Sequence, residues 1–227
     1  MEDESEITID IELDGIVSGI CYAPFNKAKT YLERKNLRII SLKENAGLVM
    51  LAFELRIDTN AVIHRMGNFT KEGGLFIPGK GSFLIPESPI LEFAEQATNA
   101  HRVNKEFYLT NKDYVEKLLV NSYKLPKRTL DIPVKNIGIH ELTAQIYGEL
   151  AKPYSEFLEG LDHFDTVFIE VPSEEEINMH EKPFVRQLWR GSSYSPMEIN
   201  YGYIKLDTNR SRGINGDLEN IKRKLGL

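Results

Sequence analysis

Cysteine is almost absent from this 227-residue sequence, in which Cys21 is the only one. A single thiol cannot form an internal disulfide or a cysteine-based zinc site. The sequence also lacks an apolar run of the ~20 residues needed to cross a bilayer. Its acidic beginning has no apolar stretch typical of a secretory signal. We therefore expect a cytoplasmic protein with no membrane contact.

Acidic and basic residues are unevenly distributed along the chain. The net charge is -6, but residues 1–14 carry seven acids and no base, and the remainder carries 27 acids and 28 bases. Overall acidity therefore does not exclude nucleic acid as a partner. Basic residues gather in 27–43, 102–128 and 205–224. If these segments met on one face, they would form a nucleic-acid footprint, which is our third hypothesis for function.

The stretch GLFIPGKGS, residues 74–82, comes close to a phosphate-binding loop. It fits G-x-x-x-x-G-K, but Gly81 stands where the motif needs Ser or Thr, and Pro78 lacks a backbone N–H. A β-hairpin fits better, with the turn at 78–81. We expect no nucleotide and no cofactor there. Both faces of the hairpin are apolar, so Phe76 and Phe83 either lie inside the fold or contact a partner.

Helical and strand patterns are mixed without regular alternation, which predicts an α+β fold with a mainly antiparallel sheet and packed helices. We expect strands at 7–14, 47–57, 75–77, 82–85, 106–110, 165–171 and 197–207, and helices at 24–36, 59–65, 88–101, 111–121, 139–150, 153–161, 173–182 and 218–225. The chain forms either one domain or two subdomains, 1–125 and 126–227, divided near the prolines of 124–133.

Nucleophilic and zinc-peptidase motifs are missing. There is no G-x-S-x-G, and the residue four positions after His140 is Ala144, where a second histidine would be needed. Carboxylates and imidazoles gather on either side of one predicted strand, and such groups suit a divalent ion or acid–base chemistry. This alternative hypothesis of a metal-assisted or acid–base hydrolase rests on Asp162, His163, Asp165, His180 and Glu181.

The segment 182–196 holds the only tryptophan, Trp189, between Arg186 and Arg190, with Tyr194 nearby. Arginine and aromatic side chains together often form the strongest contacts of protein interfaces, and they can also bind anions. The alternative interpretation places the aromatic residues in the core, with exposed arginines beside them. Our preferred hypothesis is a non-catalytic binding or assembly protein that contacts a protein partner or copies of itself, as a homo-oligomer, through this segment or the hairpin.

Overall fold

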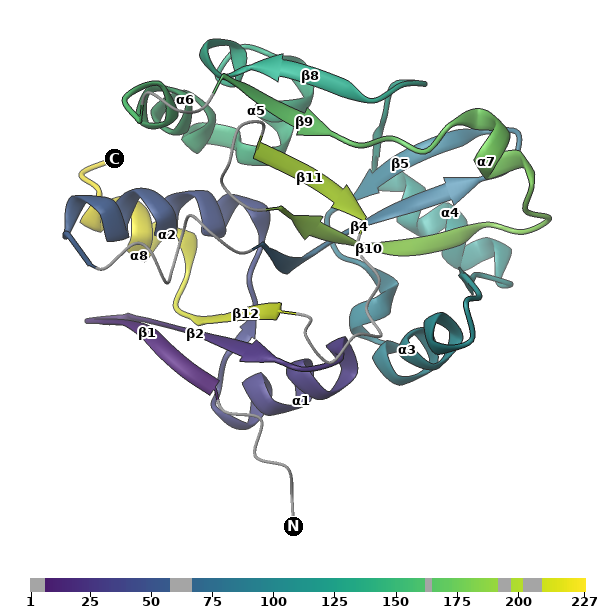
Figure 1. Cartoon of the computed structure of the whole chain (residues 1–227), viewed down its shortest axis with the longest axis horizontal. Coiled ribbons are helices and arrows are strands. Elements are labelled where there is room, and N and C mark those ends of the chain that lie inside the picture. The colour runs from purple at the N-terminus through teal and green to yellow at the C-terminus, as the bar shows by residue number, and fades with distance from the viewer. Residues whose placement is uncertain (1–6, 58–66, 162–164, 192–196, 202–209) are drawn as a thin grey trace.

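The computed structural model describes residues 7–57, 67–161, 165–191, 197–201 and 210–227 (Figure 1). These residues form a mixed, mostly antiparallel twelve-stranded sheet with packed helices, which confirms the α+β class. The strands are β1 Ile7–Leu13, β2 Ile16–Tyr22, β3 Arg38–Ile39, β4 Asn68–Ile77, β5 Gly81–Ile85, β6 Phe107–Tyr108, β7 Tyr123–Lys124, β8 Leu130–Pro133, β9 Thr166–Ile169, β10 Phe184–Arg190, β11 Met197–Tyr201 and β12 Arg210–Asn215. The α-helices are α1 Phe25–Arg34, α2 Leu42–Glu54, α3 Ala94–Arg102, α4 Lys112–Val120, α5 Glu141–Tyr147, α6 Ala151–Glu159, α7 Glu174–Asn178 and α8 Leu218–Lys224.

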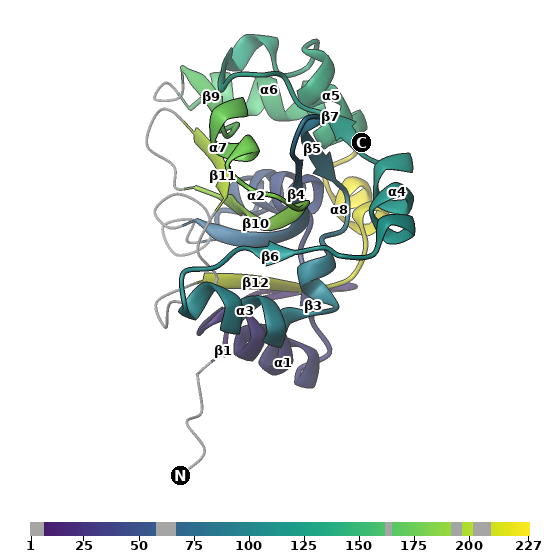
Figure 2. The ribbon, with the colours of Figure 1, turned by 90° about the vertical axis from the view of Figure 1, so that its right-hand side faces the viewer.

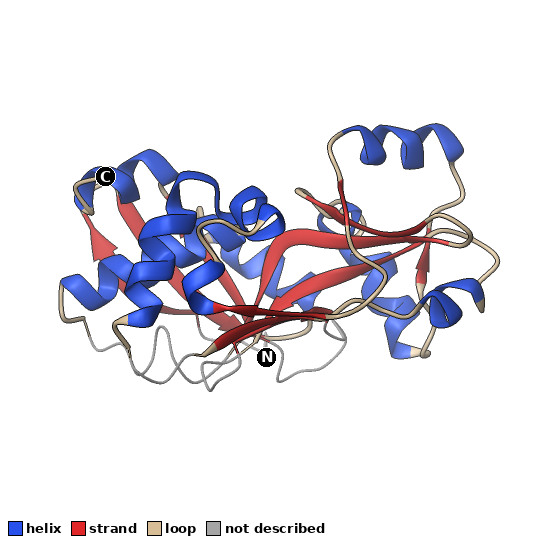
Figure 3. Cartoon of the chain, turned by 90° about the horizontal axis from the view of Figure 1, so that it is seen from above, coloured by secondary structure: helices blue, strands red, loops and turns tan. Residues whose placement is uncertain are grey.

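The main path of the sheet runs β1-β2-β12-β4-β10-β11-β9-β8. Strands β4 and β10 continue past this path, where β5 pairs with β4, β6 with β10, and β7 with β5. Seen from above, the molecule is elongated, and strands connect the helix-rich end that carries the C-terminus to a second group of helices (Figure 3). Because β12 lies between β2 and β4, and β10 lies beside β4, the segments 1–125 and 126–227 share one sheet.

Helices cover both faces of the sheet (Figure 2). The larger core cluster lies on the α2 face, where α2, α5, α6 and α8 pack on the strands. A second cluster lies on the opposite face under α1, α3 and α4. Among the described residues, no helix is both long and apolar enough to span a bilayer.

The apolar run at 47–57 was expected to be a buried strand, and this prediction was wrong. Residues 42–54 form α2, whose N-terminus is a capping box between Ser41 and Glu44. Residues 46–52 are all buried, because the sheet and three other helices surround α2. A helix buried on all sides has no amphipathic period, so its sequence looks like that of a buried strand. The predicted helix at 59–65 lies outside the described residues.

The sequence of residues 7–14, ITIDIELD, alternates strictly, which is typical of a strand with one acidic, exposed face. The pairing of β1 with β2 instead shifts between Ile9 and Ile11, which marks a β-bulge at Asp10. An extra residue in a strand moves the following side chains to the other face. Ile7 therefore packs against the second core cluster, whereas Ile11 belongs to the larger one. The bulge also turns Asp10 inward, where its side chain is only 6% exposed.

The hairpin predicted at 75–85 is confirmed as β4 and β5, with Gly79 and Gly81 at φ 75° and 103°. Positive φ suits glycine, which explains both residues of the turn. The chain itself covers both faces of the hairpin. Phe76 is fully buried, and Phe83 is partly buried against the α3–α4 core. The hairpin therefore does not present its apolar faces to a partner.

Candidate functional site

The Arg-Trp-Arg segment forms strand β10, which the sequence did not reveal. Successive side chains of a strand point to opposite faces. Accordingly, Leu188 between the two arginines belongs to the α2-face core, whereas Trp189 packs with the opposite core. Arg186 and Arg190 therefore lie on one face and Trp189 on the other. The three side chains therefore do not form one binding site.

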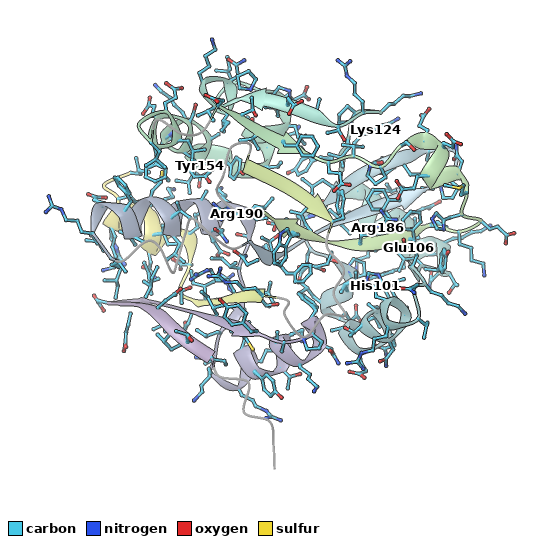
Figure 4. The ribbon with its side chains drawn as sticks, viewed as in Figure 1. His101, Glu106, Lys124, Tyr154, Arg186 and Arg190 are labelled. Atoms are coloured by element: carbon cyan, nitrogen blue, oxygen red, sulfur yellow. The ribbon has the colours of Figure 1, made fainter. Side chains whose placement is uncertain are left out.

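Arg186 contacts two glutamates and two aromatic rings. Its guanidinium lies 2.7 Å from Glu106 and 2.8 Å from Glu176, and 5.8 and 5.3 Å from the rings of Phe76 and Phe184. Figure 4 shows Arg186 beside Glu106, with Arg190 nearer the middle of the molecule. Burial opposes the charged form, but hydrogen bonds and charges of the two glutamates prevail and raise the pKa of Arg186.

A small aromatic surface lies next to Arg186. The Tyr108 hydroxyl is 2.9 Å from Nδ1 of His180, whose ring centroid is 4.3 Å from that of Phe184. Tyr108 is 38% exposed and the neighbouring Met179 is 72% exposed. We call the side chains of Tyr108, Met179 and His180 the Tyr108 surface. It brings His180, a predicted catalytic residue, close to Phe184 and Arg186.

Two of the predicted catalytic residues lie at opposite ends of the sheet. Ile199 of β11 pairs in parallel with Ile169 and antiparallel with Arg190. Asp165 precedes Ile169 and His180 precedes Arg190, so from Ile199 they extend in opposite directions. At roughly 3.3 Å per residue, the intervening strand segments alone span about 30 Å. Asp165 and His180 therefore do not share a metal ion or a cleft.

The remaining predicted site residues are either exposed or lie outside the described part of the chain. Glu181 is exposed. Asp162, His163 and Tyr194 lie outside the described residues. Within the described part of the chain, no group of three or more His, Cys, Asp or Glu could hold a metal ion.

Trp189 is partly buried, and its position requires a glycine. Its ring meets Phe69 edge-on with centroids 4.8 Å apart. A Cβ at Gly67 would lie 2.5 Å from the indole nitrogen and 2.2 Å from the Arg190 carbonyl oxygen. Trp189 is thus a packing residue, in agreement with the core interpretation of this side chain.

Sequence reasoning missed a buried group of arginines on the α2 face. Arg190, Arg210 and Arg212 are 5%, 4% and 2% exposed. Residues 210–215, for which no strand was expected, form the central strand β12. Asp10 accepts two hydrogen bonds from Arg212, at 2.8 and 2.7 Å, and Ser18 accepts a third. The only sequence signal was the alternation R-S-R, which places two arginines on one face of a strand.

A carboxyl group also lies on this face, at the N-terminus of α2. The backbone N–H of Leu42 donates to both carboxylate oxygens of Glu72, at 3.1 and 3.0 Å. Burial raises the pKa of Glu72 to about 7, although hydrogen bonds from the backbone limit the rise. Glu72 therefore changes charge near neutral pH.

We expect the free energy of unfolding to fall with rising pH because of Glu72. The unfolded carboxyl ionises near 4.5, but the folded one ionises only near 7, so the unfolded state binds fewer protons in this window. The wild type should lose up to about 3 kcal/mol relative to Glu72→Gln between about pH 5 and pH 8. Urea unfolding of both proteins at several pH values measures this difference. A constant difference would contradict it.

The basic segments considered for nucleic-acid binding contain several neutralised charges. Lys29 lies 2.6 Å from Glu33, Lys43 lies 2.6 Å from Glu149, and Lys127 lies 2.9 Å from Glu174. Exposed ion pairs of this kind are typical of ordinary protein surfaces. These contacts do not favour the nucleic-acid hypothesis.

Comparisons with known proteins add no family to this description. No protein-family model, no curated protein and no solved structure matches the chain. The proposals for its function therefore rest on the geometry of the chain itself.

Proposed function

We propose that the protein acts by binding another protein, without catalysis, through the Tyr108 surface. The observation that carries this proposal is the exposure of Tyr108 and Met179 together with the contact that fixes Tyr108 against His180. Tyrosine and methionine side chains are enriched at interfaces. A side chain that is fixed before binding loses less conformational entropy when the partner arrives. The hydrogen bond between Tyr108 and His180 and the packing of His180 on Phe184 provide this order.

The charge around this surface favours a basic partner. Glu175 and Glu181 are exposed and close to Met179 and His180 in the chain, while Glu174 pairs with Lys127. Arg186 is already neutralised by Glu106 and Glu176. Complementary charge steers association and selects partners. We therefore propose a partner that presents a Lys- or Arg-rich segment with an apolar side chain to contact Met179.

The experiment is binding of the full chain to an array of basic 12-residue peptides that each contain one apolar side chain. We expect Met179→Lys to weaken binding at least tenfold, which corresponds to about 1.4 kcal/mol. The matched control is Ile139→Lys, because Ile139 is 81% exposed and the charge change is the same. The control should bind as the wild type does.

Two results would contradict the proposal. One is that no basic peptide binds, and the other is that both variants lose affinity equally. Light scattering tests self-association in parallel. A dimer that Met179→Lys dissociates would show that a second copy, rather than a basic partner, occupies the Tyr108 surface.

A further inference from the structure

A surface cavity lies between α4 and the chain that connects β5 to α3. Helix α4 packs on β5 at the edge of the molecule (Figure 2). The cavity has a volume of about 350 Å³, which is within the range of small-molecule sites. Residues of the segment 85–92 line one wall. Tyr114, Lys117, Leu118 and Asn121 line the other, and their spacing places them on one face of a helix.

Hydrogen bonds fix both walls of this cavity. Pro89 begins a short 3₁₀ helix, and the side chain of Ser88 accepts a hydrogen bond of 3.3 Å from the backbone N–H of Ile90. On the other wall, the Asn111 side chain caps α4 by accepting from the backbone N–H of Tyr114 at 3.0 Å. Walls that are ordered before binding reduce the entropy cost of holding a ligand.

Two exposed carboxylates, Glu87 and Glu92, line the cavity. Neither forms an ion pair with another described residue. The Tyr114 hydroxyl donates to Glu92 over 3.4 Å, which is a long hydrogen bond. Burial, together with the negative charges of Glu92 and Glu87, raises the pKa of Tyr114, so both carboxylates lie near its hydroxyl. These oxygens can therefore accept hydrogen bonds from a cationic donor.

The remainder of the lining suits a ligand with an apolar part. Lys117 is the one basic residue of the lining, so two carboxylates and one ammonium group leave a net charge of -1. Aromatic rings such as that of Tyr114 attract ammonium groups. The apolar lining residues are Ile85, Pro86, Pro89, Leu91 and Leu118.

A second cavity, of about 420 Å³, adjoins the first and shares Glu87, Leu91 and Glu92 with it. Among its other lining residues, bases outnumber acids by three to two: Lys29, Arg38 and Lys71 against Glu33 and Glu44. A second ammonium group of a ligand would meet this excess of positive charge. We therefore expect a ligand with a single cationic end.

We propose that the cavity beside α4 binds a primary alkylammonium group, from a free aliphatic amine or from a lysine side chain of a peptide. The ammonium group has three N–H donors, which the carboxylates of Glu87 and Glu92 accept in charge-assisted hydrogen bonds. The alkyl chain packs on the apolar lining. A calcium ion fits less well, because it takes six to eight oxygen ligands.

The experiment is an amide NMR titration of the isotope-labelled full chain with butylamine, butanol and butyrate at neutral pH, where butylamine is charged. We expect butylamine to shift the signals of residues 85–92 and 114–121, with a Kd of about 1 mM. Butanol and butyrate lack the positive charge, so they should bind at least about tenfold more weakly.

The methylamide of Nα-acetyl-lysine distinguishes the two sources of the ammonium group. Binding as tight as that of butylamine indicates a lysine side chain of a peptide, whereas binding of butylamine alone indicates a free amine. Met179→Lys should leave both affinities unchanged, because Met179 does not line the cavity. Amine binding therefore tests this site independently of the Tyr108 surface.

The decisive variant is Glu92→Gln, which keeps the size of the exposed side chain and removes its charge. It should weaken butylamine binding about tenfold. Glu116→Gln is the matched control, because Glu116 is exposed on the same helix wall but does not line the cavity, and it should bind as the wild type does. Lys117→Met should bind butylamine at least as tightly as the wild type, because it removes a like charge.

Three results would overturn the proposal. The first is that butanol binds as tightly as butylamine. The second is that Glu92→Gln and Glu87→Gln both keep the full affinity, or that the shifted signals lie outside the two walls. The third is that Lys117→Met loses affinity, since Lys117 would then contact a negative group of the ligand.

Discussion

Asp10→Ala should destabilise the protein by about 3–5 kcal/mol, a large part of the 5–15 kcal/mol that usually stabilises a domain. Arg212 is 2% exposed, and Asp10 accepts two of its hydrogen bonds. Without the carboxylate, Arg212 keeps its charge in the interior, where Ser18 still accepts a hydrogen bond from it. The free energy of unfolding in guanidinium chloride measures the effect.

The control for this variant is Glu12→Ala on the same strand. Glu12 is exposed, so its loss should change stability by less than about 0.5 kcal/mol. The double variant Asp10→Ala/Arg212→Met should regain most of the lost stability, because both buried charges are removed together. Equal stability of Asp10→Ala and Glu12→Ala would contradict the buried ion pair.

Phe76→Ala should cost about 3–5 kcal/mol and leave the solution mass unchanged. The Phe76 ring is fully buried, stacked 5.0 Å from Phe184 and edge-on 5.1 Å from Tyr201. Truncation leaves a cavity at the point where β4, β10 and β11 meet. Chemical unfolding and light scattering together test both parts of this prediction.

Phe53→Ala makes the same chemical change at a half-exposed position. Phe53 is 49% exposed and meets Phe157 edge-on, with ring centroids 5.3 Å apart. Its loss should cost about 1 kcal/mol. A change of oligomeric state in Phe76→Ala, without loss of stability, would instead support the hypothesis that the hairpin is an interface between copies of the chain.

Local signals in the sequence predicted the elements that local contacts determine. The hairpin followed from the glycines at 79 and 81, which adopt positive φ. Asn111 caps α4 and Ser173 caps α7, because each side chain accepts a hydrogen bond from the backbone N–H three residues on. The tail helix at Leu218–Lys224 begins after Asp217, which serves as its cap. In each case the cause lies within a few residues of the effect.

Elements that depend on distant partners were not predictable in the same way. The β-bulge at Asp10 is explained only by Arg212, which lies two hundred residues later in the chain. The sequence of helix α2 has no amphipathic period because other elements surround the helix. Strand β12 was not predicted because its sequence contains two arginines. A strand can bury arginines only where other parts of the chain surround them, and the composition of the strand does not show those parts. The Tyr108 surface likewise joins β6 to the turn after α7 through a contact 72 residues apart.

The position of β12 has a consequence for the order of folding. This strand comes from the last part of the chain but lies between β2 and β4, both made much earlier. During synthesis, the edges of β2 and β4 that pair with β12 therefore stay unpaired until residue 215 has left the ribosome. Unpaired strand edges of this kind are prone to aggregation. Slow elongation, or a stop before residue 215, would leave a protein that depends on chaperones.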